Sequence, residues 1–163
     1  NGDNISITHQ TTLIGYPTNY SIRFGFWDVV PSSTTGPTAF TIKNNLTGWG
    51  NYGWSCSNGS FSPCITQTER NNMFILNVNP PNQPVSDHFP NSLAVGSWTA
   101  AKLVDAAACN AGNIDGCALA TDSPGYRTAD DGTDRGVNIP TLKAALGLSS
   151  GSVCSWHTSP VCQ

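Results

Sequence analysis

Three short segments of the chain can be laid over one another, and each places two polar residues between strand-forming residues. They are residues 7–11, 42–46 and 69–73, at offsets of 35 and 27 residues. Repeats of this length are typical of stacked architectures, in which each unit buries its face only against its neighbours. The Asn-Asn pairs at 44–45 and 71–72 suit the bends of a stack, because Asn tolerates left-handed backbone and hydrogen-bonds locally. A β-sandwich with Asn in its turns explains the same pattern, so both architectures stay open on periodicity alone.

The first 80 residues are expected to form strands separated by polar turns. Apolar and polar residues alternate over residues 20–26 and again at Phe40 and Ile42, which is the period of a strand with one buried face. Glu69 is the only Glu in a chain rich in Asn, Thr, Ser and Gly, a composition that favours strands and turns over helices.

The six cysteines fall in three neighbouring pairs with a spacing of eight: Cys56 and Cys64, Cys109 and Cys117, Cys154 and Cys162. This spacing favours three local disulfides, each stabilising by about 2–3 kcal/mol on the chain-entropy model. An even count without a CxxC motif favours an oxidising compartment over a zinc site, so we expect a secreted protein. Cys154 and His157 could instead offer two metal ligands, but nothing nearby supplies the others.

After the proline-rich connector at 79–84, the sequence pattern changes from one typical of strands to one that favours short helices. We expect one helix over residues 97–108, with an apolar stripe that includes Trp98 packed in the core, and a second helix near 140–146. Between them, residues 130–136 form a turn-rich segment. We divide the single structural domain into residues 1–78, a capping region at 79–147 and a disulfide-closed tail at 148–163.

A family resemblance is carried by an ordered series of motifs. These are Asn-Ile-Ser-Ile-Thr-His at 4–9, Phe-Thr-Ile-Lys-Asn-Asn at 40–45, the aromatic glycine stretch 48–53, Arg-Asn-Asn at 70–72, His-Phe-Pro at 88–90, and Ser-Pro-Gly-Tyr at 123–126 leading to residues 131–138. In this order they resemble the C-terminal part of secreted bacterial pectin-lyase-like proteins over about residues 4–142. The longer, more helical stretch at 97–116 and the tail after Gly147 depart from that pattern.

The resemblance implies a mostly β fold: the terminal coils of a right-handed parallel β-helix, with short helices and a disulfide-stapled C-terminal cap. The first coil, near residues 5–12, would then present an open edge to the upstream part of the same polypeptide or to identical chains. The implied function is to bind or help process extracellular polysaccharide. A non-catalytic structural or adhesive unit that stacks into an assembly is the alternative.

Catalysis is not expected within this chain alone. The resemblance implies a polysaccharide lyase with carboxylate-bound calcium, or a hydrolase with paired carboxylates. Residues 1–80 contain only Asp3, Asp28 and Glu69 as acids, which are too few and too scattered. If the whole protein is an enzyme, its site is expected mostly upstream of this chain.

Two groups of residues are candidates for binding. Asp130, Asp131 and Asp134 could hold Ca²⁺, although Asp and Gly are also ordinary turn residues, and we favour the turn. The aromatic residues are Trp27, Trp49, Tyr52 and Trp54. Their rings could stack on sugars, but we favour packing in the interior or on a flank.

Other classes of partner are not indicated. A net charge of -3 gives no basic footprint for nucleic acid, and no apolar run is long enough to span a bilayer. No signal peptide is recognisable, so any such signal was removed or lay further upstream. His9, His88 and His157 are far apart and outside nucleophile motifs; His9 is expected in a turn. Sequons occur at Asn4, Asn19, Asn45 and Asn58.

Overall fold

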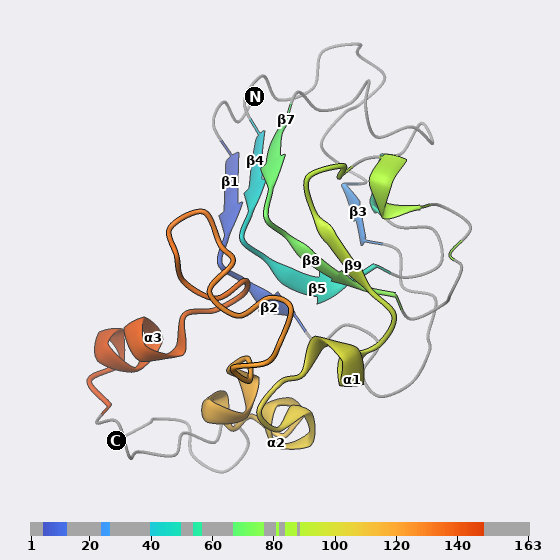
Figure 1. Cartoon of the computed structure of the whole chain (residues 1–163). Helices are drawn as coiled ribbons and strands as arrows, with labels where there is room; N and C mark the ends of the chain where they lie inside the picture. The colour runs from blue at the N-terminus through green and yellow to red at the C-terminus, as the bar shows by residue number, and fades with distance from the viewer. Residues whose placement is uncertain are drawn as a thin grey trace.

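The described strands pair in parallel, and short polar bends lead from strands of one sheet into strands of the next (Figure 1). The computed structural model describes residues 5–12, 24–26, 40–49, 54–56, 67–76, 81, 84–87 and 89–148. One sheet has the order β1 (Ile5–Thr8), β4 (Phe40–Lys43), β7 (Gln67–Arg70). A second has the order β2 (Thr11–Thr12), β5 (Leu46–Gly48), β8 (Met73–Ile75), β9 (Leu93–Val95). A third pairs β3 (Phe24–Phe26) with β6 (Trp54–Cys56).

The strand register confirms the alignment of the three sequence segments. Ile7 pairs with Ile42, which pairs with Glu69, and Thr11 pairs with Leu46 in the same way. All the described strand pairs are parallel, whereas a sandwich of the immunoglobulin kind would need antiparallel ones. The sandwich alternative is therefore excluded for these strands.

The bends between the two larger sheets have the same backbone in each unit. His9, Asn44 and Asn71 have φ of 52°, 59° and 54°, the left-handed region that Asn tolerates better than most residues. This confirms the predicted role of the Asn pairs and of His9 as turn residues. The bend redirects each chain segment from the first sheet into the second.

Both faces of the second sheet are covered by apolar side chains. On one face Met73, Ile75 and Val95 pack with Trp98 and Leu119 in a buried cluster, which confirms the expected core position of Trp98. The intervening Phe74 points to the opposite face, because successive side chains of a strand alternate. There it lies 5.0 Å from Trp49, and Phe89 lies 5.7 Å from Trp49, measured between ring centroids.

The expected single helix over residues 97–108 is wrong. The structure has α1 (Trp98–Ala101) and α2 (Ala106–Asn110), separated by Lys102 at φ 55° and by a bridge from Leu103 to Leu119. Ser97 and Asp105 cap the two helices separately. Val104, expected in the apolar stripe, is 61% exposed because it lies in the break.

The remaining C-terminal elements follow their local signals. Two short 3-10 helices are η1 (Val85–Asp87) and η2 (Ile114–Cys117). The second predicted helix is confirmed as α3 (Ile139–Ala145), with Pro140 in its first turn and Gly147 at φ 70° after its end. The Cys109–Cys117 disulfide ties α2 to η2 as predicted. The side chains of Cys56, Cys64, Cys154 and Cys162 lie outside the described residues.

A loop of residues 125–137, called the strap below, crosses the outer side of the bends (Figure 1, orange). It is closed on itself by a hydrogen bond from Arg135 N to Gly125 O of 3.0 Å. Further hydrogen bonds join it to three successive units of the stack: Arg135 Nη1 donates to Asn72 O, Gly136 N to Asn44 O and Val137 N to Thr11 Oγ1. Among the described helices, none is long and apolar enough to cross a membrane.

Candidate functional site

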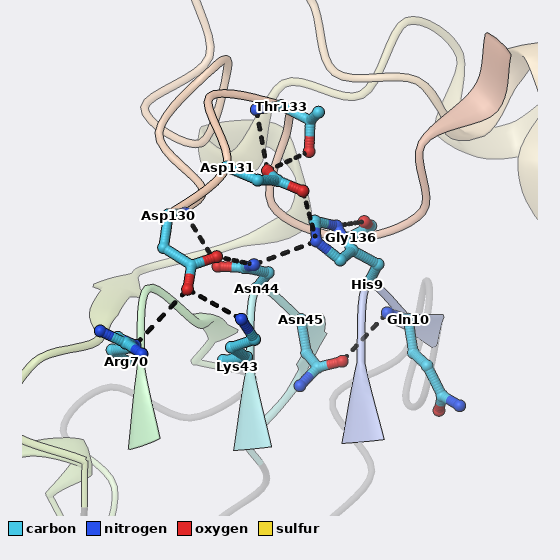
Figure 2. Close-up of polar contacts among 10 residues, drawn as sticks. All are labelled: His9, Gln10, Lys43, Asn44, Asn45, Arg70, Asp130, Asp131, Thr133 and Gly136. Atoms are coloured by element: carbon cyan, nitrogen blue, oxygen red, sulfur yellow. Dashed lines mark hydrogen bonds and ion pairs between the residues drawn. The ribbon is translucent and has the colours of Figure 1, made fainter. Parts of the chain in front are cut away.

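The outer side of the bends carries a cluster of charged side chains (Figure 2). Lys43 ends β4 and Arg70 ends β7, and the parallel register makes them partners. The strap brings Asp130 onto this pair from 87 residues beyond Lys43. The cluster therefore joins two neighbouring strand ends to a loop far away in the sequence.

Asp130 is the centre of this cluster. Its Oδ2 lies 2.9 Å from Lys43 Nζ and 3.5 Å from Arg70 Nε. Asn44 donates from Nδ2 to the carboxylate, and Asn44 Oδ1 accepts from the Asp130 backbone N–H at 3.1 Å. The Asn44 hydrogen bond, followed by that of Lys43, lowers the pKa of Asp130, while partial burial opposes them. The carboxylate is therefore held ionised by contacts with two units of the stack.

Asp131 and His9 connect the strap to the first bend. Asp131 Oδ1 accepts from the Thr133 hydroxyl at 2.7 Å and backbone N–H at 3.0 Å, and these bonds lower the pKa of Asp131. His9 Nε2 lies 3.1 Å from Asp131 Oδ2. The other ring nitrogen lies 3.2 Å from Gly136 O, which can only accept, so Nδ1 carries a proton. Both ring nitrogens of His9 are thus engaged within the protein.

The predicted calcium ligands do not converge as a set of three aspartates. Asp130 and Asp131 come together with His9, their ligand atoms lying within 4.8 Å of one another. Asp134 is outside this group, and its Oδ1 accepts from Arg127 N at 2.9 Å. Because calcium takes about 6–8 oxygen ligands and Asp130 already faces two cations, the geometry favours the structural-turn interpretation.

Both carboxylates of the cluster are engaged by other side chains. Asp130 is paired with Lys43 and Arg70, and Asp131 with Thr133 and His9. Both carboxylates therefore already have partners within the protein, and the Asp131 side chain keeps 50% of its surface exposed. Among the described residues, this is the one group of at least three acidic, histidine or cysteine side chains close enough to share an ion.

A second polar column lies on the inner side of the bends, one residue further along the chain. Asn45 is 2% exposed and Asn72 0% exposed. Asn45 Nδ2 donates to Asn72 Oδ1 at 3.0 Å, and Asn72 Nδ2 donates to Ser92 Oγ at 3.1 Å. Gln10 begins this column through its backbone N–H, which donates to Asn45 Oδ1 at 3.0 Å. We call Gln10, Asn45, Asn72 and Ser92 the ladder.

Of the aromatic candidates for sugar binding, Trp49 is packed in the interior, which is the interpretation that we favoured. Its side chain is 1% exposed and packs edge-on against Phe74 and Phe89, so its ring has no face available to a sugar. Trp27 and Tyr52 lie outside the described residues; Trp54 begins β6, but its side chain is not described.

A hollow of about 400 Å³ lies between the strap and the start of α3. Tyr126, Arg127, Asp134 and Asn138 contribute to its lining. The Arg127 guanidinium carbon lies 5.3 Å from the centroid of the Tyr126 ring. Sequence reasoning missed this hollow, because the motif at 123–138 was interpreted as a turn and nothing in it indicates that it meets the start of α3.

One of the sequon asparagines is buried. This residue is Asn45, and its side chain is enclosed in the ladder, so a folded chain cannot accept a glycan there. The other sequon asparagines, Asn4, Asn19 and Asn58, lie outside the described residues.

No family model, no curated protein and no solved structure matches this chain.

Proposed function

We propose that this chain forms terminal coils of an extracellular right-handed parallel β-helix, and that its role is structural: it stacks on further coils. The observation that carries the proposal is the position of β1 and β2. Among the described strands they lie at the edges of the two larger sheets, and both belong to the segment of residues 5–12. Parallel strands at an edge offer backbone groups for another strand in the same register.

Contacts that the candidate residues already make within the protein support a structural role over a catalytic one. The carboxylates of Asp130 and Asp131 already hold the strap to the bends. The buried Trp49 ring is likewise committed to packing. The Cys109–Cys117 disulfide supports an oxidising compartment, because such bonds are rare in reducing ones.

Hydrogen exchange tests the open edge directly. We expect amides of residues 5–12 to exchange faster than those of residues 40–48, because β4 and β5 are paired on both sides and β1 and β2 on one. Mass spectrometry of peptic fragments from the disulfide-intact chain measures both segments in one sample. Equal protection of the two segments in a monomeric chain would contradict the proposal.

A second candidate function is glycan binding in the hollow beside α3. An aromatic ring, a guanidinium and a carboxamide line it, which are groups that recognise sugars through ring stacking and hydrogen bonds. A glycan array followed by titration of the Arg127→Asn variant tests it, since Asn tolerates the φ of 50° at this position. Binding that is unchanged in this variant would locate the glycan elsewhere.

A further inference from the structure

The ladder has a direction: each side-chain amide serves the unit that precedes it in the chain. Asn45 Oδ1 accepts from Gln10 N, and Asn45 Nδ2 donates to Ile7 O at 3.0 Å. Asn72 repeats this one unit later, accepting from Asn45 N at 3.1 Å and donating to Ile42 O at 3.0 Å. Each ladder amide thus satisfies a bend N–H and the carbonyl three residues before it in the preceding unit.

The two ends of the ladder differ in a way that follows from this direction. At the β9 end, Ser92 Oγ accepts from Asn72 N at 3.2 Å. The Ser92 N–H donates to Phe89 O at 3.1 Å, so the bend donor and the carbonyl three residues before it satisfy each other. This end is closed and needs no further ladder residue.

The Gln10 end is open. Gln10 is exposed, and within the described residues its side-chain amide has no hydrogen-bond partner, although the ladder rule gives it two. Its backbone N–H is already bonded to Asn45 Oδ1. The amide can therefore neither serve its own bend nor bond to the corresponding bend of a second copy.

Resting on the proposed stacking role, we infer that the Gln10 amide binds one further parallel coil, supplied by the same polypeptide ahead of Ile5. That coil presents a bend N–H to Gln10 Oε1 and a carbonyl three residues earlier to Gln10 Nε2. In that coil, the residue directly before the bend N–H takes the position that His9, Asn44 and Asn71 hold in the described units, which has left-handed backbone. We therefore expect Asn or Gly there. The β9 end of a second copy does not fit, because its bend donor is bonded to Phe89 O.

An extended chain tests this inference. A copy of residues 40–66 replaces residues 1–4 and ends directly before Ile5, which reproduces the 27-residue offset between the Asn45 and Asn72 units. We expect residues 5–12 to gain hydrogen-exchange protection in the extended chain. Gln10→Leu should then reduce that protection about tenfold, and leave the unextended chain unchanged, because the hydrogen bonds form only with the added coil. Gln10→Asn, the residue of the next two units, should preserve it.

The outcomes separate the two proposals. Protection that appears in the extended chain and is indifferent to Gln10→Leu would overturn the ladder inference and leave stacking standing. A folded extended chain without added protection would overturn stacking itself. If the extended chain does not fold, a peptide of residues 40–49 is titrated into the unmodified chain. A chemical-shift change of the Gln10 side-chain amide is then expected, and its absence at saturating peptide would overturn the inference.

Discussion

Two polar columns run along the bends of this molecule one residue apart, and they hold different things together. The outer column consists of His9, Asn44 and Asn71, which have left-handed backbone. His9 and Asn44 are hydrogen-bonded to the strap. The inner column is the ladder, which bonds unit to unit inside the stack. Asn44 and Asn45 are adjacent and chemically identical, so their roles are set by the bend and not by residue type.

The largest effect is expected from a substitution in the inner column. Asn72→Leu removes the partner of the buried Asn45 N–H and of Ile42 O, and should cost about 3 kcal/mol because each group is left without a hydrogen bond. Asn71→Gly is the matched control in the outer column, because its φ of 54° suits Gly and should cost about 0.5 kcal/mol or less. Urea denaturation measures both. Equal losses would erase the distinction between the columns.

The strap has its own matched pair of glycines. A Cβ on Gly136, which has φ 97°, would meet Thr11 Oγ1 and lie 2.9 Å from Leu46 Cβ, so Gly136→Ala should cost about 2–3 kcal/mol. Gly132 has φ 78° but nothing within 4 Å of an added Cβ, and Gly132→Ala should cost about 1 kcal/mol from backbone strain alone. Thermal and urea unfolding compare the two variants. A larger loss at Gly132 would show that the strap is not packed against the bends.

The sequence was sufficient for features that depend on local chemistry or on repetition. The offsets of the three segments follow from repetition, and the left-handed Asn bends, the Cys109–Cys117 bond and α3 follow from nearby residues. The prediction of one helix over 97–108 is wrong because the Ala-rich pattern favours a continuous helix and does not reveal the left-handed turn at Lys102. Tertiary contacts with Leu119 and two separate caps decide that region.

The charged cluster was out of reach for a different reason. Lys43 and Arg70 occupy equivalent positions in the aligned segments, so their proximity was implied by the repeat. Their carboxylate partner comes from the strap, and no periodicity connects residue 130 to residue 43. In the sequence, Asp130 belongs to an acidic run, which is typical of calcium binding, but in the structure its partners are the cations of Lys43 and Arg70.

Removing the Asp130 charge should weaken the outer column by a moderate amount. Asp130→Asn keeps the shape but loses the pairs with Lys43 and Arg70, and we expect a loss of about 1 kcal/mol, since the site is partly exposed to solvent. Because the folded pKa of Asp130 and Asp131 is lowered, their stabilisation is present above the unfolded pKa of about 4 and is lost as pH falls through the folded values. Urea unfolding from pH 6 to pH 2 measures this loss of stability. A pH dependence of the Asp130→Asn variant as steep as that of the unaltered chain would refute the stabilising role of the Asp130 carboxylate.

The smallest effect is expected from removing calcium, and here the absence of a change is informative. If cations of the protein itself hold Asp130, a chelator should leave the melting temperature unchanged, and added Ca²⁺ should not raise it. Lys43→Met with Arg70→Met is the decisive variant, because it removes both competing charges and leaves Asp130, Asp131 and His9 in place. Calcium-dependent melting of the unaltered chain would restore the metal interpretation. Calcium dependence confined to the double variant would show that the two side chains occupy the position a cation would otherwise take.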